Sequence, residues 1–336
     1  MRAVSLPEYG PPEVLRLVDA PKPEPGPRDL LVRVVATSVN PVDTKIRSGG
    51  QRNIIRYRLP WILGLDVSGV VEGVGKDVRG FAVGDAVWSS PTHRRPGTYA
   101  EYVVIAAREA AHKPRTLTHL EAASLPLVAL TAYQCLFEHG RLARGQTVLV
   151  HAGAGGVGTV AIQLARHAGA RVVTTASARN AELVRSLGAD VVVDYATTRV
   201  ADVVRDVDLI LDSLGEPAYA ENLAAIRRGG RISNITLDVT DHVERYGPNL
   251  SLLTLGWSFA RFHARPWLDK RVAFRHVIKR CDGAQLRTIA DLVDQGALRP
   301  VVDRVLPLEA VVEAHHLSES RRVRGKLVLQ VADEPR

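Results

Sequence analysis

The sequence predicts an α/β protein with two domains, one rich in short β-strands and one built on a doubly wound parallel sheet. In the first 120 residues, apolar segments such as Leu30–Thr37 and Val67–Val74 are separated by glycine and proline, as in small barrel-like β domains. From about Glu121 onwards, apolar strands alternate with amphipathic helices, which indicates parallel strands joined by helical crossovers. The change near Glu121 therefore marks the approach to the second domain.

Each predicted element follows from the spacing of its apolar residues. In the first part, further strands are expected over Ala86–Trp88 and Tyr99–Ile105. In the second part, strands are predicted at Thr147–His151, Arg171–Thr175, Val191–Val193, Val207–Asp212 and Arg231–Ile235, and helices at Gly156–Ala168, Asn180–Leu187 and Ala218–Ile226. Beyond them we expect a sixth strand at Leu252–Phe259, helices at Asp269–Cys281, Ala284–Gln295 and Leu308–Glu319, and strands at Val301–Leu306 and Lys326–Val331.

The composition is that of a globular protein with a large core, because 46% of the 336 residues are hydrophobic and 24% are charged. No apolar run is long enough to cross a membrane, and the first residues lack the apolar core of a signal peptide. Two cysteines are too few for a disulfide framework, so a cytoplasmic setting is expected. The formal net charge of +8 is spread over short, separate clusters without a nucleic-acid-binding motif, so nucleic acid is not an expected partner.

One turn of the second domain has glycine at the positions of the G-x-G-x-x-G pattern. It follows the strand Thr147–His151 and opens the helix Gly156–Ala168, which is the context in which this pattern binds dinucleotides. The first glycine permits a tight turn, the second lets the backbone approach a pyrophosphate, and the third lets the helix pack on the strand. The alternative is a glycine-rich turn without a ligand. The predicted cofactor-binding residues of the turn are Gly153, Ala154, Gly155, Gly156, Val157 and Gly158.

The residues after the second strand of this domain favour NADPH over NADH. A site for NAD usually has an acidic residue there, which binds the ribose 2′-hydroxyl, but this chain has Ala176. Ser177 and Arg179 follow, and they offer a hydrogen bond and a bidentate contact to a 2′-phosphate. The alternative is that Ser177 only caps a helix and Arg179 is a solvated residue of its first turn.

Several short motifs occur in a fixed order along nearly the whole chain. They are Asn40–Pro41–Val42–Asp43, Gly64–Leu65–Asp66–Val67–Ser68–Gly69, Phe81–Ala82–Val83–Gly84–Asp85–Ala86–Val87, Gly97–Thr98–Tyr99–Ala100–Glu101–Tyr102, the glycine turn, Arg185–Ser186–Leu187–Gly188–Ala189–Asp190 and Gly325–Lys326. In this order and spacing, the chain resembles the medium-chain dehydrogenase/reductase superfamily. Within it, the chain is most similar to the zinc-free NADPH:quinone and enone oxidoreductases.

This resemblance implies a GroES-like catalytic domain over residues 1–122 and 297–336, and a Rossmann domain that binds NADPH over residues 123–296. It also implies an active site in the cleft between the two domains. By resemblance, Tyr195 contacts the 2′-phosphate and Thr131 faces the nicotinamide, although a threonine inside a helix also commonly bonds its own backbone. A homodimer joined near Leu252–Phe259 is implied as well.

The catalytic zinc ligands of the alcohol dehydrogenases in this superfamily align with Asn40, Leu65 and Leu127. Zinc in proteins is bound by thiolate, imidazole or carboxylate groups, which these side chains do not supply, so no metal is expected. Asn40 is a candidate catalytic residue, because its amide can bond the acceptor carbonyl or the cofactor ribose. The alternative is that Asn40 only initiates the turn that contains Pro41.

The expected activity is zinc-independent transfer of hydride from NADPH to a quinone or an α,β-unsaturated carbonyl compound, acceptors that need no Lewis acid. An enoyl-thioester reductase with the same fold is one alternative. A non-catalytic NADPH-binding redox sensor or RNA-binding protein is another, which the basic sequence mildly favours. No motif indicates the proton donor, for which Tyr57 and water are both candidates.

Overall fold

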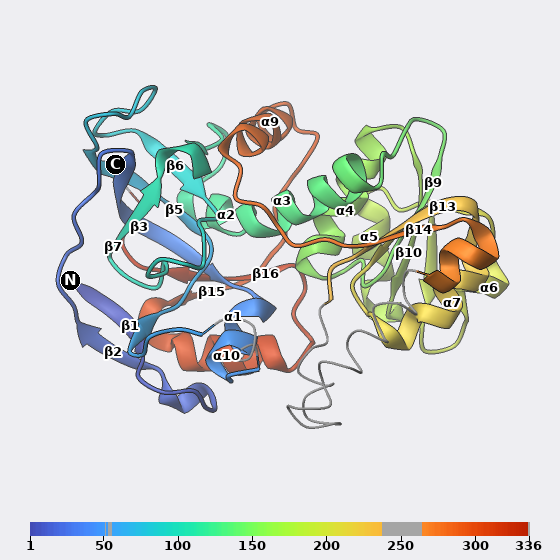
Figure 1. The fold of residues 1–336 in the computed structure, drawn as a ribbon, viewed down its shortest axis with the longest axis horizontal. Helices are drawn as coiled ribbons and strands as arrows, with labels where there is room; N and C mark the ends of the chain where they lie inside the picture. Colours follow the sequence, from blue (N-terminus) through green and yellow to red (C-terminus); the bar gives the residue numbers. More distant parts are fainter. Residues whose placement is uncertain (51, 53–55, 237–263, 335–336) are drawn as a thin grey trace. The chain divides into compact units, whose positions relative to one another are not determined.

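The computed structural model describes residues 1–50, 52, 56–236 and 264–334 of the chain (Figure 1). The chain divides into two compact units. Unit 1 consists of Met1–Leu130 and Arg280–Arg336, and unit 2 consists of Thr131–Lys279. Unit 1 is therefore built from both ends of the chain, and unit 2 is built from its middle.

Unit 2 is organised around a six-stranded parallel sheet (Figure 1). In spatial order its strands are β11 (Val191–Asp194), β10 (Arg171–Ala176), β9 (Thr147–Val150), β12 (Val207–Asp212), β13 (Ile226–Asn234) and β14 (Ala273–His276). The strand order reverses between β9 and β12, which is the topology of the Rossmann fold. Apolar strand residues such as Leu149, Val173 and Ile210 form the core. The predicted doubly wound sheet is confirmed.

Helices occupy the connections between these strands. They are α4 (Gly156–His167), α5 (Ala181–Ser186), α6 (Val200–Val203) and α7 (Tyr219–Ala225), with the shorter segments η4 (Ala178–Asn180) and η5 (Glu216–Ala218), and residues 264–270 are also helical. The segment η3 (Gln134–His139) precedes β9. The apolar side of α4 faces inwards, because Ile162 and Leu164 are almost fully buried. No helix in the described part of the chain is both long and apolar enough to cross a membrane.

The helix predicted over Asp269–Cys281 is wrong, because the strand β14 occupies Ala273–His276. Val272 and Phe274 are buried, whereas the residues between and beside them are exposed. This alternation has the period of two that is typical of a strand. The strand predicted at Leu252–Phe259 lies outside the described residues.

Unit 1 contains two sheets (Figure 1). The larger sheet has the order β15 (Val302–Pro307), β16 (Lys326–Gln330), β3 (Asp29–Val39), β5 (Val67–Val74), β6 (Ala86–Ser89) and β8 (Ala110–His112), and β7 (Tyr102–Ala106) also pairs with β3. The smaller sheet has the order β2 (Arg16–Asp19), β1 (Arg2–Leu6) and β4 (Trp61–Ile62). The β-rich, GroES-like fold expected for the N-terminal part is confirmed.

The helices of unit 1 come from both parts of the chain. They are α1 (Pro41–Arg47), α2 (His119–Ala123), α9 (Gly283–Asp294) and α10 (Val311–Glu319), the first residues of α3 (Pro126–Tyr133), and the short segments η1 (Pro12–Val14), η2 (Ala107–Glu109) and η6 (Leu308–Ala310). α1 and α10 contact each other, although they lie far apart in the sequence.

The unit boundaries differ from the predicted domain limits of 1–122, 123–296 and 297–336. α9 belongs to unit 1 because it packs on β8 and η2, so closely that a Cβ at Gly283 would lie 2.3 Å from Ala110 O. At the other end of α9, Asp294 accepts hydrogen bonds from the backbone and the hydroxyl of Thr116. Packing of this kind leaves no mark on the local composition, so the place of α9 could not be read from the sequence around it.

Candidate cofactor site and catalytic residues

The glycine turn joins β9 to α4 and is fixed to the neighbouring strand β10. Gly153 N donates to Thr175 O at 2.9 Å, and Ala152 N donates to Thr175 Oγ1 at 3.0 Å. A Cβ at Gly153 would lie 2.1 Å from Thr174 Oγ1, and a Cβ at Gly158 would lie 2.4 Å from Ala152 O. The packing of the protein itself therefore requires glycine at both positions.

Gly155 differs, because the protein leaves room for a side chain there. The only atom that an added Cβ would approach within 4 Å is Ala152 O, at 3.3 Å. Gly155 is the N-cap residue of α4, and its extended backbone suits any residue. The open space lies at a helix N-terminus, whose unpaired N–H groups attract anions. The turn therefore fits the pyrophosphate of a dinucleotide.

Three adjacent strands bring the predicted cofactor residues to one edge of the sheet. β9 leads into the glycine turn, β10 leads into Ser177, and β11 leads into Tyr195. The last residues of β10 and β11, Ala176 and Asp194, are partners in the strand register. Ser177 and Tyr195 therefore leave the sheet at the same level.

Ser177 and Arg179 belong to the segment between β10 and α5. Ser177 is the N-cap residue of η4, but its side chain makes no capping hydrogen bond. The alternative that Ser177 serves as a cap thus lacks its expected contact. Ser177 is half-buried and Arg179 is exposed, so a ligand at this edge can reach both side chains.

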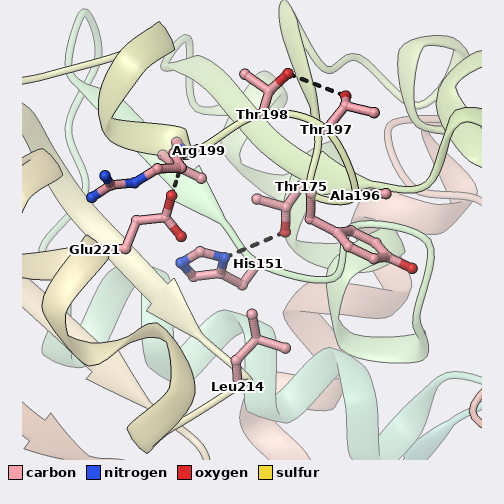
Figure 2. Close-up of a pocket in the computed structure, with 10 residues that line it drawn as sticks. His151, Thr175, Ala196, Thr197, Thr198, Arg199, Leu214 and Glu221 are labelled. Carbon is pink, nitrogen blue, oxygen red and sulfur yellow. Dashed lines mark hydrogen bonds between the residues drawn. The ribbon is translucent and has the colours of Figure 1, made fainter.

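A pocket of about 310 Å³ opens at the same edge (Figure 2). Of the predicted residues, Tyr195 lines it. The other lining residues are His151, Thr175, Ala196, Thr197, Thr198, Arg199, Val200, Leu214 and Glu221. His151, Thr175 and Leu214 lie at the carboxyl ends of parallel strands, a position that marks ligand sites in such sheets and was the available signal. Glu221 and the residues from Thr197 to Arg199 carried no recognisable sequence signal.

Hydrogen bonds hold the walls of this pocket in place. His151 Nε2 lies 2.7 Å from Asn222 Oδ1, and its Nδ1 lies 3.3 Å from Thr175 Oγ1, a contact drawn in Figure 2. Asp212 Oδ1 accepts hydrogen bonds from the backbone N–H groups of Leu214 and Gly215. The loop after β12 is therefore ordered by the carboxylate that ends this strand.

Asn40, the predicted catalytic residue of unit 1, follows β3 and is the fully buried N-cap residue of α1. Its Nδ2 donates to Asp66 Oδ2 at 2.9 Å, and its Oδ1 accepts a hydrogen bond from Lys326 Nζ. Its backbone N–H donates to Asp43 Oδ2 at 2.9 Å, which forms the capping contact of α1. The amide that was expected to meet a ligand therefore already has two internal partners.

These partners form a buried polar network. Lys326 Nζ donates to Val39 O at 3.0 Å and lies 3.4 Å from Asp66 Oδ2. Asp66 Oδ1 accepts a hydrogen bond from Leu127 N at 2.7 Å, and Ser38 Oγ donates to Asp66 Oδ2 at the same distance. Burial lowers the pKa of Lys326, and the Asp66 carboxylate opposes this shift. The network ties β3, β16 and the start of α3 together.

The other predicted positions are distributed over both units. Thr131 is buried in α3 and is the first residue of unit 2, whereas Asn40 belongs to unit 1. Leu65 is buried and Leu127 is half-buried. Among the residues that the structure describes, no group of three or more His, Cys, Asp or Glu side chains is arranged to hold a metal ion.

Comparison with known proteins agrees with this architecture. The model of the alcohol dehydrogenase GroES-like domain matches residues 26–115, and the model named zinc-binding dehydrogenase matches residues 187–329. The mitochondrial NAD(P)H oxidoreductase RTN4IP1 of Mus musculus is 36% identical over 327 residues, which cover 91% of this chain and 82% of that protein. The 2-methylene-furan-3-one reductase of Solanum lycopersicum is 32% identical over 341 residues, which cover 98% of this chain and 79% of that protein.

Solved structures show the same relationship. The quinone oxidoreductase of Coxiella burnetii has a TM-score of 0.84 and 33% identity, and the match covers 98% of this chain and 99% of that one. A mycobacterial protein solved as a complex with NADPH has a TM-score of 0.82 and 32% identity, and the match covers 98% of this chain and 100% of that one. The chain therefore belongs to the quinone and enone oxidoreductase family of the medium-chain dehydrogenase/reductase superfamily, and it is an enzyme that uses a nicotinamide cofactor.

Proposed function

We propose that this enzyme reduces quinones or α,β-unsaturated carbonyl compounds with NADPH and without a metal ion. Its main support is the edge of the unit 2 sheet, where the glycine turn, Ser177 and Tyr195 follow three adjacent strands. When NADPH is bound there, it supplies the hydride. The protein binds and orients the cofactor and the acceptor.

The names of the relatives support this acceptor class. They include the 2-methylene-furan-3-one reductase of tomato, an NADPH-dependent alkenal/one oxidoreductase of Arabidopsis thaliana and a quinone oxidoreductase of Triphysaria versicolor. A quinone, an alkenal and a methylene-furanone share a carbonyl group conjugated to a carbon–carbon double bond. This shared group accepts hydride without prior activation by a metal, so we assign it to the acceptor of this enzyme.

The absence of an acid at the end of β10 supports NADPH rather than NADH. Ala176 ends this strand, so no carboxylate at that position repels a 2′-phosphate. The hydroxyl of Ser177 and the guanidinium of Arg179 follow within three residues, and Tyr195 leaves the neighbouring strand at the same level. We propose that these three side chains bind the 2′-phosphate.

The Arg179→Ala variant is expected to bind NADPH about tenfold or more weakly, because it loses a charged hydrogen-bond donor to the phosphate. Its affinity for NADH should change little. Fluorescence titration with both reduced cofactors measures the two affinities. Arg185→Ala, which removes an exposed arginine from the following helix α5, is the matched control. An equal loss for NADPH and NADH in Arg179→Ala would contradict the assignment.

We also propose that no zinc ion takes part in the reaction. The side chains aligned with the zinc ligands of alcohol dehydrogenases are those of Asn40, Leu65 and Leu127, which are not zinc ligands in proteins. In this fold the amide of Asn40 is already bonded to Asp66 and Lys326. The match to the model named zinc-binding dehydrogenase begins at residue 187 and includes none of the three positions.

Asn40 and Thr131 are the proposed catalytic residues. Asn40 keeps one amide hydrogen and one lone pair beyond its bonds to Asp66 and Lys326. Because its side chain is fully buried, the proposed contact with an acceptor carbonyl or a cofactor ribose requires a local rearrangement around it. Thr131 offers its hydroxyl to the nicotinamide from α3.

Steady-state oxidation of NADPH with a panel of small quinones, enones and enoyl thioesters tests the activity. We expect turnover with quinones or enones, unchanged after treatment with a metal chelator. Turnover with thioesters alone would instead indicate an enoyl-thioester reductase. Tight NADPH binding without any turnover would indicate a non-catalytic binding protein, and activity that is lost to chelation and restored by zinc would contradict the metal-free mechanism.

We further propose a homodimer formed at the edge of the unit 2 sheet. The predicted dimer segment Leu252–Phe259 lies outside the described residues, among which β14 is the outermost strand of the sheet, and outer strands favour pairing with another chain. Ile278 follows this strand and is 72% exposed, while Trp267 and Leu268 are 51% and 68% exposed. Exposed large apolar side chains near an outer strand are candidates for contacts between chains.

A further inference from the structure

The pocket at the edge of the unit 2 sheet contains a carboxylate that the phosphates of a dinucleotide do not explain. Glu221 projects from α7 and is one of the residues that line the pocket (Figure 2). A negative side chain beside a site for a phosphate-rich cofactor costs binding energy through charge repulsion. A compensating contact with a hydrogen-bond donor of the ligand would offset this cost.

Glu221 is held so that one of its oxygens is left for a ligand. Oε1 accepts a hydrogen bond from the backbone N–H of Val200, at the start of α6, and this contact fixes the carboxylate at the pocket wall. Within the described part of the chain, no group donates a hydrogen bond to Oε2. An ionised carboxylate only accepts hydrogen bonds, so a ligand group that binds Oε2 must be a donor.

Other walls of the pocket suit a flat aromatic ring. Tyr195 and Leu214 both line it, and they are 66% and 42% exposed. A planar base that covers these side chains removes apolar surface from water, which favours binding. The volume of about 310 Å³ lies at the lower end of the range of small-molecule pockets, as expected for one part of a larger ligand.

The position of the pocket fits the base of the cofactor. In the proposed function, the pyrophosphate lies on the glycine turn and the 2′-phosphate lies at Ser177. Tyr195 follows β11 and Leu214 follows β12, the strands on either side of β9 and β10, so the pocket adjoins both phosphate sites. The part of the dinucleotide next to the phosphorylated ribose is its purine base.

We infer that Glu221 recognises the adenine base of the cofactor by accepting a hydrogen bond from its 6-amino group, an inference that rests on the proposed function. The 6-amino group is a donor, whereas hypoxanthine and guanine have a keto oxygen, an acceptor, at the same position. That oxygen would face the carboxylate of Glu221 and be repelled. Glu221 therefore makes the enzyme selective for an adenine dinucleotide.

Binding of NADPH is compared with binding of its reduced hypoxanthine analogue, which differs in the purine at position 6. We expect the wild-type enzyme to bind NADPH about tenfold or more tightly, the size expected for a hydrogen bond to a charged group. In Glu221→Gln, the ratio of the two dissociation constants should fall to one or below, because the amide NH2 group that replaces Oε2 donates to the keto oxygen of hypoxanthine and cannot accept from the adenine amino group. Fluorescence titration of both reduced cofactors measures the ratio.

The Gln variant keeps an oxygen that accepts from Val200 N, so the fold is expected to survive, and the melting temperature verifies this. Asp202→Asn removes an exposed carboxylate from the neighbouring helix α6 without touching the pocket, and it should keep the wild-type ratio. Equal wild-type affinities, or an unchanged ratio in a stable Glu221→Gln variant, would overturn the inference and leave the proposed function standing. Failure of the wild-type enzyme to bind either NADPH or NADH would overturn both.

Discussion

Asp43 shows how strongly the interior of unit 1 changes the behaviour of a single side chain. It is fully buried in α1, where Oδ2 accepts a hydrogen bond from Asn40 N and Oδ1 has no partner among the described residues. Burial raises the pKa of Asp43 to about 7, against the opposing effects of the Asn40 N–H group and of Lys326. Near neutral pH, the Asp43 carboxyl group is therefore protonated in part of the molecules.

The raised pKa of Asp43 predicts a measurable dependence of stability on pH. Between its unfolded value of 3.8 and its folded value of about 7, the folded chain holds a proton that the unfolded chain has released. This contribution to the free energy of unfolding is fully present below the unfolded pKa of 3.8 and is lost as the pH rises through the folded pKa of about 7. The asparagine of Asp43→Asn does not titrate, so only the wild type loses this contribution. Between pH 5 and pH 8, the free energy of unfolding of the wild type should therefore fall relative to that of Asp43→Asn by on the order of 2 kcal/mol.

Urea unfolding of both proteins at the two pH values measures this difference. Burial lowers the pKa of His119 to about 4 and that of His315 to about 3. Both groups therefore lower the free energy of unfolding as the pH falls below 6.5. They are present in both proteins, and their effects cancel in the comparison. Asp77→Asn, in the exposed turn after β5, should show no such gain. Parallel pH profiles of wild type and Asp43→Asn would contradict the prediction.

Single residues were predictable where their signal is local. The glycine turn and the missing acid at Ala176 could be read from a few neighbouring positions. The partners of Asn40 could not, because Lys326 is 286 residues away in the sequence. Glu221 was missed for the same reason, since only the folding of α7 beside α6 brings it to the pocket.

At the scale of elements, the glycines of the turn between β9 and α4 differ in how much space the protein leaves for a side chain. Gly153 and Gly158 have no room for a Cβ, because Thr174 and the carbonyl of Ala152 occupy the space. At Gly155 the single contact of an added Cβ is milder, 3.3 Å from Ala152 O, so in the proposed function a need for glycine there comes from the ligand. The proposed function therefore predicts that stability and cofactor binding depend on different glycines of one short turn.

Two alanine substitutions test this separation. Gly158→Ala places a Cβ against backbone atoms and should destabilise the fold by about 1–3 kcal/mol. Gly155→Ala should leave the melting temperature almost unchanged but weaken NADPH binding about tenfold or more, because its methyl group occupies the space into which the pyrophosphate fits. Thermal melting and NADPH titration of both variants provide the comparison. Unaltered NADPH affinity in Gly155→Ala would show that the ligand does not approach this residue.

Most of the predicted strands were correct to within one or two residues, including short ones such as β11, but the short strand β14 was missed. β12 matches its expected limits of Val207–Asp212, and β5 matches Val67–Val74. The helix expected at Asp269–Cys281 is wrong because the four-residue strand β14 lies there, and Phe274 is its only buried apolar residue. Its place is decided by pairing with β13, which is a tertiary contact and not a local preference.

At the scale of the whole molecule, both fold classes followed from the sequence, whereas the place of α9 depends on tertiary packing. The Rossmann sheet and the GroES-like unit are marked by alternating and punctuated patterns along the chain. The assignment of α9 to unit 1 depends on its packing against β8, which no local pattern encodes. The association of chains is likewise a property of a surface, and it requires a direct test.

The proposed homodimer predicts that the protein in solution has twice the mass of one chain. Ile278→Glu should shift the mass measured by light scattering towards that of a single chain, because it places a charge in an apolar interface. Val83→Glu changes a similarly exposed residue of unit 1, which is 66% exposed, and should leave the dimer intact. A wild-type protein of single-chain mass, or a dimer untouched by Ile278→Glu, would rule out association through this surface.

The discontinuity of unit 1 also sets an order for events on the ribosome. Unit 2 is complete when residue 279 has been made, but Asp66 meets Lys326 only after 260 further positions of chain, when β16 has formed beside β3. A nascent chain that stops before β16 has the Asp66 carboxylate without its cationic partner and leaves one edge of β3 unpaired, two features that favour unfolding and aggregation. Unit 1 is therefore expected to become stable only after β16 has been translated and has paired with β3.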